Sequence, residues 1–180
     1  MTRQFEKTNL PGVTLISLKR HTDHRGSFVR LFDVDLKIDI ALAQTALSFN
    51  PIKHTLRGMH LQRSPHAEAK LVYCTRGRLH DVVVDLRPQS PTYCRWYSIE
   101  LCAEDSQLLL VPPGCAHGFL TLENDTELLY HISERYMPEC EMGVAWNDPV
   151  FGIEWPFVPA VISERDQNHP PFEVASCASS

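Results

Sequence analysis

Two ionisable residues interrupt a strand-like segment in the first third of the chain. Arg57 and His60 lie in the otherwise largely apolar run TLRGMHLQ, residues 55–62. Charged side chains are rarely buried in a β core, so ionisable residues inside strand-like runs are the best candidates for functional residues. Strict alternation would place Arg57 and His60 on opposite faces, but Gly58 between them can seat a bulge that turns both inward. The alternative is a surface arginine next to a hydrogen-bonded histidine.

Four further polar residues lie near strand-like segments. Lys70 opens an apolar run, His117 follows a Pro-Pro-Gly turn, Tyr130 shares a strand face with aliphatic residues, and Asp166 lies in a polar turn. Each alone has an ordinary structural explanation, such as a strand-end lysine or a core tyrosine with its hydroxyl satisfied. Together with His60 they offer a base, a phenol, an amine and a carboxylate, which is the set that proton transfer needs.

Several other chemistries lack sequence support. The chain contains no G-x-x-x-x-G-K-[ST], G-x-G-x-x-G or G-x-S-x-G motif, which argues against nucleotide triphosphates, dinucleotides and serine hydrolysis. A three-histidine metal site of a small β-barrel would need a second histidine two residues after His60, where the chain has Gln62. His21, His24 and His66 fall in predicted loops. The sequence therefore predicts no metal site.

Composition narrows the class of protein. The chain has 180 residues and a formal net charge of −5, which predicts one domain over residues 1–180 with its core at about 10–170 and argues against a broad nucleic-acid surface. A basic pocket for one phosphorylated ligand stays possible. No apolar run approaches the ~20 residues of a membrane span, and the first residues are polar, so we expect a cytoplasmic protein without a signal peptide. The six cysteines show no C-x-x-C spacing and are expected to be reduced thiols.

Short strand-like runs separated by turn residues dominate the chain, which favours an antiparallel sandwich or barrel. Only 33–42 and 138–143 are expected to be helical, and the last 30 residues to wrap the core as an extended segment. The expected strands are 13–18, 27–32, 45–50, 56–61, 70–75, 78–85, 95–101, 107–111, 117–121 and 126–133.

A set of ordered motifs resembles the dTDP-4-dehydrorhamnose 3,5-epimerase family. They cover residues 10–170, and their order and spacing together are far more specific than any one of them. The matching segments are DHRG at 23–26, LRGMHLQ at 56–62, KLV at 70–72, DVVVDLR at 81–87, SP at 90–91, PGCAHGF at 113–119, WNDP at 146–149 and S-x-x-D at 163–166.

The resemblance implies an all-β, cupin-type jelly roll with a few short helices, usually a homodimer, that needs no metal or organic cofactor. Members act on nucleotide-diphosphate 4-keto-6-deoxysugars. By position, His60 would be the base, Asp166 its carboxylate partner, Lys70 the stabiliser of the oxyanion at C4, and Tyr130 the acid on the far face. The resemblance further implies substrate-binding roles for Arg25, Phe28, Gln44, Arg57, His117 and Tyr136, with Arg25 and Arg57 holding the diphosphate.

Three positions depart from the family pattern. Arg30 stands where the family usually has a Glu that helps to recognise thymine, and Ala46 stands where it has a ligand-contacting Asn. His131 replaces the Lys that commonly follows the tyrosine. All the proton-transfer residues of the family are present, so the resemblance implies the family's chemistry. The three departures concern the choice of sugar nucleotide.

Two other functions compete with epimerisation of C3, C5 or both. One is a sugar-nucleotide 3,4-ketoisomerase, which usually has a different arrangement of histidines from the L-R-G-x-H segment. The other is a non-catalytic sugar-nucleotide binder, which Arg30 and Ala46 would favour. Neither the number of epimerised carbons nor the nucleotide follows from the sequence.

Overall fold

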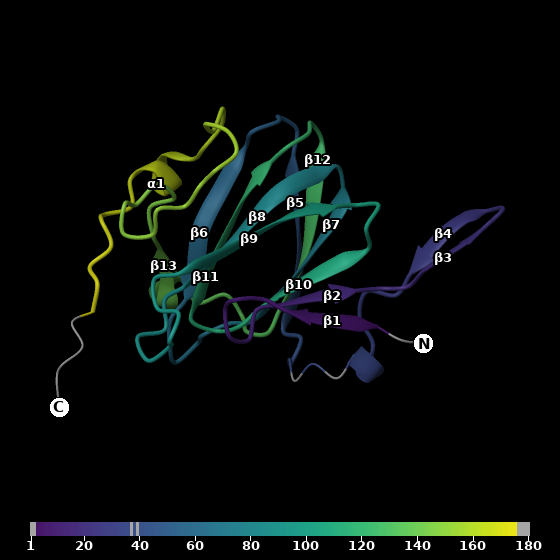
Figure 1. The fold of residues 1–180 in the computed structure, drawn as a ribbon, viewed down its shortest axis with the longest axis horizontal. Coiled ribbons are helices and arrows are strands. Elements are labelled where there is room, and N and C mark those ends of the chain that lie inside the picture. The colour runs from purple at the N-terminus through teal and green to yellow at the C-terminus, as the bar shows by residue number, and fades with distance from the viewer. Residues whose placement is uncertain (1–2, 37, 39, 176–180) are drawn as a thin grey trace.

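Two antiparallel sheets pack face to face in the computed structural model, which describes residues 3–36, 38 and 40–175 (Figure 1). One sheet has the strand order β1-β2-β10-β7-β12-β5 and the other β13-β6-β11-β8-β9. The six strands of the first are β1 (Gln4–Lys7), β2 (Thr14–Ser17), β5 (Gln44–Asn50), β7 (Lys70–Arg76), β10 (Gln107–Val111) and β12 (Thr126–Ile132). The five of the second are β6 (Leu56–Gln62), β8 (Arg78–Asp85), β9 (Trp96–Cys102), β11 (Cys115–Thr121) and β13 (Glu141–Gly143).

The other elements lie outside this sandwich. Strands β3 (Arg20–Asp23) and β4 (Gly26–Val29) form a separate hairpin that projects from the body at the right of Figure 1. The helical segments are the 3-10 turns η1 (Val34–Leu36) and η2 (Pro138–Cys140) and the helix α1 (Glu164–Gln167). No helix in the described part of the chain is long and apolar enough to cross a membrane.

The apolar core forms three layers. The central one fills the space between the sheets with residues such as Val72, Val83 and Phe119. A second layer lies on the outer face of the five-stranded sheet, where the C-terminal segment contributes Trp155 and Phe172. A third covers the outer face of the six-stranded sheet. Because the five-stranded sheet is covered on both faces, every residue of its central strand β11 is buried. A strand in that position has a largely continuous apolar sequence instead of an alternating one.

The architecture confirms the expected all-β jelly-roll sandwich, and each of the ten expected strands is present. The expected helix over 33–42 is wrong: only Val34–Leu36 turn, as a 3-10 segment, and residues 37 and 39 lie outside the described part. The segment 138–143 is helical only at Pro138–Cys140, because residues 141–143 pair with the edge of β6 instead. Strands β1 and β3 were not expected, and their side chains are all exposed, so no apolar alternation marks them.

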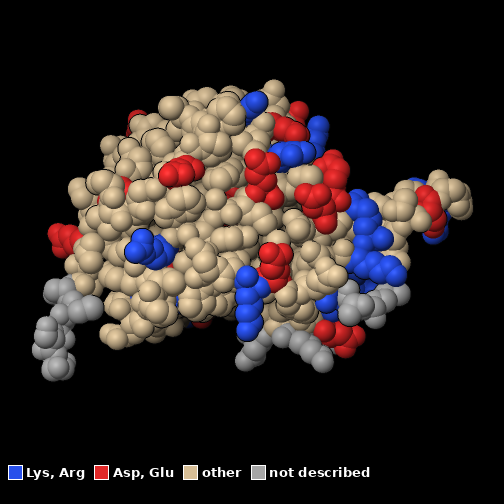
Figure 2. Space-filling model, viewed as in Figure 1, with Lys and Arg blue, Asp and Glu red and all other residues tan. Residues whose placement is uncertain are grey.

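Charge on the face shown in Figure 2 is mixed, with acidic and basic side chains interspersed over a mostly uncharged surface. No continuous basic stripe crosses this face within the described residues. The five cysteines in the described part of the chain form no disulfide.

A buried carboxylate accepts hydrogen bonds from several residues of the turn after β8. Asp85 is fully buried and accepts hydrogen bonds from Arg87 Nε at 2.8 Å, Ser90 Oγ at 2.5 Å and Thr92 Oγ1 at 2.6 Å. Burial alone would raise the pKa of Asp85, but these donors outweigh it and lower the pKa to about 2. The charged form is therefore favoured in the folded state.

Replacement Asp85→Asn is expected to lower the free energy of unfolding by about 2 kcal/mol at pH 7. Because the folded-state pKa is depressed, this stability is present above pH 3.8 and is lost as the pH falls toward 2. Urea denaturation at several pH values measures it: the gap between wild type and variant should shrink below pH 4. A gap of constant size across this range would contradict the assignment.

Candidate active site

A cavity of about 640 Å³ opens between the two sheets. Arg57, His60 and His117 line it from the five-stranded sheet. The six-stranded sheet contributes Lys70 and Tyr130 from the opposite wall. Eight of the ten predicted site residues line this one cavity: Gln44, Arg57, His60, Lys70, His117, Tyr130, Tyr136 and Asp166.

A bulge in β6 turns Arg57 and His60 to the same side. His60 pairs with His117 and Arg57 with Phe119, so three steps along β6 match two along β11. Gly58 takes a φ of +123°, which favours glycine, and a Cβ there would lie 2.5 Å from the Cα of Gly118. The bulge predicted from Gly58 is therefore confirmed.

His60 is held by a carboxylate from the C-terminal segment. Its Nε2 lies 2.7 Å from Oδ1 of Asp166, and the backbone N–H of Gly58 donates to Oδ2 at 3.1 Å. Helix α1 places Asp166, because Ser163 caps the helix and its Oγ accepts from Asp166 N. With Nε2 donating to the carboxylate, Nδ1 carries the free lone pair of the neutral ring.

The charge of Asp166 is stabilised in place. Its side chain is only 6% exposed. Burial by itself would raise the pKa of this carboxyl, but the hydrogen bond and charge of His60 and the N–H of Gly58 outweigh burial and lower the pKa. A carboxylate held ionised beside the ring stabilises an imidazolium there. This pair can therefore accept a proton from a ligand.

The opposite wall carries an amine and a phenol. Lys70 Nζ donates to the backbone oxygen of His60 at 3.1 Å and lies 3.0 Å from Oε1 of Glu68, which leaves one N–H for a ligand. Burial raises the pKa of Tyr130, and the nearby charge of Asp81 adds to this, so its hydroxyl stays protonated. The hydroxyl has no hydrogen-bond partner among the described residues.

His117 belongs to a second histidine–carboxylate pair. Its Nε2 lies 3.0 and 2.9 Å from the two oxygens of Asp81, and the side chains are 4% and 0% exposed. The ring stands edge-on to Tyr130 at a centroid distance of 6.0 Å. His117 therefore packs against the phenol and fixes its position. Asp81 was not predicted as a site residue. It is an ionisable residue inside the strand-like run 78–85, which is the same kind of pattern that pointed to His60.

Polar partners orient the remaining side chains. Arg57 Nε donates to Asn50 Oδ1 at 2.7 Å, and Gln44 donates to the carbonyl of Glu134. Tyr136 donates to Glu141 at 2.5 Å, and Arg165 pairs with the same carboxylate. Sequence reasoning missed Asn50, Glu68, Asp81, Glu141 and Arg165. Asp81 and Arg165 meet their partners only through contacts distant along the chain, whereas Glu68 and Asn50 lie near theirs in sequence but carry no pattern of their own.

Two predicted residues are not in this cavity. Arg25 and Phe28 lie on the β3–β4 hairpin, which extends away from the body (Figure 1). The Arg25 side chain is 78% exposed and pairs with Asp23 on its own hairpin, and Phe28 is 59% exposed. Within one chain they therefore do not meet the other eight residues, and their substrate-binding role stays a prediction.

The three departures from the family pattern lie in different surroundings. Ala46 pairs with Tyr130 and shares its strand face with the cavity residues Gln44 and Ser48. His131 faces the other way, where its Nδ1 bonds Thr45. Arg30 lies 3.8 Å from Asp33 and does not line the cavity. Ala46 does not itself line the cavity, but of the three it alone lies on a strand face that contributes residues to it.

Comparison with known proteins gives one consistent answer. The family model for dTDP-4-dehydrorhamnose 3,5-epimerase matches residues 7–174. The dTDP-4-dehydrorhamnose 3,5-epimerase of Sinorhizobium fredii is 41% identical over 171 residues, which cover 92% of this chain and 88% of the relative.

Solved structures agree in fold. The enzyme of that name from Bacillus anthracis, solved with TDP and PPi, superposes with a TM-score of 0.91 at 33% identity and covers 95% of this chain and 100% of its own. ChmJ, a 3'-monoepimerase from Streptomyces bikiniensis solved with dTDP-quinovose, gives 0.85 at 33% identity, over 91% of this chain and 85% of its own. The resemblance in the motifs is thus confirmed: the chain belongs to the dTDP-4-dehydrorhamnose 3,5-epimerase family.

Proposed function

We propose that the chain inverts C3, C5 or both in a nucleotide-diphosphate 4-keto-6-deoxysugar of the dTDP-4-dehydro-6-deoxyglucose type. The observation that carries the proposal is the placement of the base and the acid on opposite walls of one cavity. His60 comes from the five-stranded sheet and Tyr130 from the six-stranded sheet. A sugar ring between them can lose a proton from one face and regain one on the other. That exchange inverts a carbon centre.

The reaction follows from the acidity of carbons next to a ketone. Nδ1 of His60 takes the proton from C3 or C5, and the C–H electrons form the enolate with its charge on the C4 oxygen. Lys70 stabilises that oxygen, a type of interaction worth a few kcal/mol. Tyr130 then donates its proton to the carbon from the far face and restores the ketone. Solvent reprotonates the phenolate and takes the proton from His60.

The remaining cavity residues are suited to holding the substrate. Arg57 keeps its two terminal nitrogens free of partners among the described residues, and a guanidinium fork fits phosphate oxygens. Gln44 and Tyr136 are proposed to contact the sugar or nucleotide. Ala46 cannot supply the amide contact that the family makes there. The experiment below therefore also tests whether the chain accepts a dTDP-linked sugar.

Incubation with dTDP-4-keto-6-deoxyglucose in D₂O tests the function, with NMR following C3 and C5. Deuterium with inverted configuration at both carbons establishes double epimerisation, and the same outcome at only one carbon establishes a monoepimerase. A carbonyl moved to C3 would instead establish the ketoisomerase. Tight binding of this nucleotide sugar without any exchange would establish the non-catalytic binder.

A homodimer is part of the proposal, because the hairpin residues lie away from the cavity of their own chain. Arg25 and Phe28 are exposed at the projecting hairpin. An exposed cation and aromatic ring on an arm would reach the cavity of a second copy, and most soluble homo-oligomers are symmetric dimers. We likewise propose that the chain forms a single domain and acts in the cytoplasm.

Complementation between two inactive variants tests the exchanged hairpin. Arg25→Ala and His60→Ala homodimers are each expected to be nearly inactive. In a purified heterodimer, one cavity receives both defects and the other none, so about half of the wild-type activity should return. Differently tagged chains allow the heterodimer to be isolated. If Arg25 served its own cavity, every cavity would carry one defect and no activity would return.

A further inference from the structure

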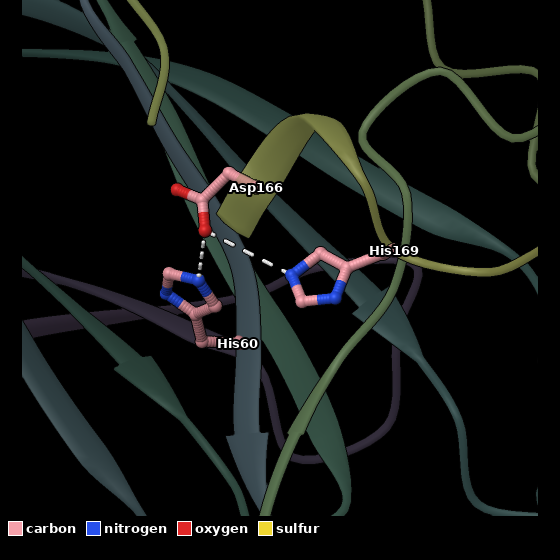
Figure 3. A group of neighbouring side chains, drawn as sticks. All are labelled: His60, Asp166 and His169. Carbon is pink, nitrogen blue, oxygen red and sulfur yellow. Dashed lines mark hydrogen bonds and ion pairs between the residues drawn. The ribbon is translucent and has the colours of Figure 1, made fainter. Parts of the chain in front are cut away.

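A second histidine lies beside the His60–Asp166 pair. His169 Nε2 is 3.8 Å from Oδ1 of Asp166, the same oxygen that His60 contacts at 2.7 Å (Figure 3). One donor atom from each of the three residues lies within 4.8 Å of the others. Figure 3 shows the carboxylate between the two imidazole rings. His169 has no role in the proposed proton transfer.

The position of His169 is fixed by a glycine on the strand next to His60. Gly143 pairs with His60 across β13 and β6, and a Cβ at Gly143 would lie 2.0 Å from Cε1 of His169. The imidazole thus occupies the space that any side chain at 143 would fill. Its own side chain is 11% exposed, and its Nε2 is buried with no hydrogen-bond partner in the part of the chain that the structure describes. A buried donor or acceptor left unpaired costs free energy, which a ligand at that atom would recover.

The donor set suits a zinc-like ion. Two imidazole nitrogens and one carboxylate oxygen are ligands that Zn²⁺ commonly takes in proteins. Bonds of ~2.0–2.2 Å in a tetrahedron place donor atoms roughly 3.3 Å apart. The contacts of 2.7 and 3.8 Å to the shared oxygen lie on either side of that value, so small side-chain rotations suffice. The fourth position would be open to water.

We propose that His60, Asp166 and His169 bind one divalent transition-metal ion such as Zn²⁺, and that the bound ion inhibits the enzyme. When the metal bonds Nε2 of His60, the proton of that nitrogen moves to Nδ1, and Asp166 changes from hydrogen-bond acceptor to ligand. The lone pair that takes the substrate proton is then lost. Binding stands on geometry alone, whereas inhibition rests on the proposed function.

Titration calorimetry with ZnCl₂ tests the binding. Wild type should bind one ion per chain through this site, and His169→Ala should weaken it by at least about tenfold. Gly143→Ala should also weaken it, because the new methyl group displaces the ring of His169 while leaving the histidine in the chain. His66→Ala is the matched control: His66 lies 3.6 Å from Glu134, outside the site, and its loss should leave the affinity unchanged.

Deuterium exchange in the presence of Zn²⁺ tests the inhibition. Zinc should stop exchange in wild type, a chelator should restore it, and His169→Ala should resist the same zinc concentration while keeping its basal rate. Equal zinc affinity in wild type and His169→Ala would overturn the site. Zinc bound through His169 without effect on exchange would overturn the inhibition. If the chain showed no exchange at all, the calorimetry would still decide the site.

Discussion

Replacement of His60 by alanine is expected to abolish deuterium incorporation at both C3 and C5. His60 is the group placed to remove the proton, and the first step of either epimerisation depends on it. General base catalysis contributes about 10²–10⁴ in rate. Removing the base stops exchange as well as inversion, so no deuterated substrate should be recovered. NMR of the sugar nucleotide after incubation in D₂O measures both.

The fold should survive this change. The His60 side chain is 32% exposed, and Asp166 keeps its hydrogen bond from Gly58 when the ring is removed. Circular dichroism and the thermal midpoint check this. His131→Ala is a matched control, because this histidine bonds Thr45 and faces away from the cavity. Exchange at the wild-type rate in folded His60→Ala would rule out His60 as the base.

Local sequence patterns predicted the strands and the bulge. Short strand-like runs bounded by turn residues marked the ten expected strands, and Gly58 between Arg57 and His60 marked the point where strict alternation breaks. These signals act over a few residues. The helix expected over 33–42 failed for the same reason, because propensity is local. Of the described residues in this segment only Val34–Leu36 form a helical turn, and Leu36, Ile38 and Ile40 belong to the apolar cluster on the six-stranded sheet.

Local patterns could not predict contacts between residues that lie far apart in the sequence. Asp166 reaches His60 across 106 positions in the sequence, and only the resemblance to a family joined them. One local signal was available, since Ser163 and Asp166 have the spacing of a helix N-cap and its third residue. The hairpin is the reverse case: motif matching assigned Arg25 and Phe28 to the site, but it does not say in which copy of the chain they act.

Replacement of Tyr130 by phenylalanine is expected to separate exchange from inversion. His60 can still remove the proton and return a deuteron to the same face, so label enters with retained configuration. Inversion, which needs an acid on the far wall, should fall by about 10²–10⁴. The change removes only the hydroxyl, and the ring keeps its edge-on contact with His117. The recovered sugar is analysed by NMR for deuterium and for configuration at C3 and C5.

Tyr97→Phe provides the control, because Tyr97 packs against the central core and does not line the cavity. It should leave both exchange and inversion at wild-type rates. If Tyr130→Phe inverted the sugar as fast as wild type, the acid would be another group. If it lost exchange together with inversion, the phenol would already be needed when the enolate forms. Retained exchange without inversion is the outcome that follows from a base and an acid on opposite sheets.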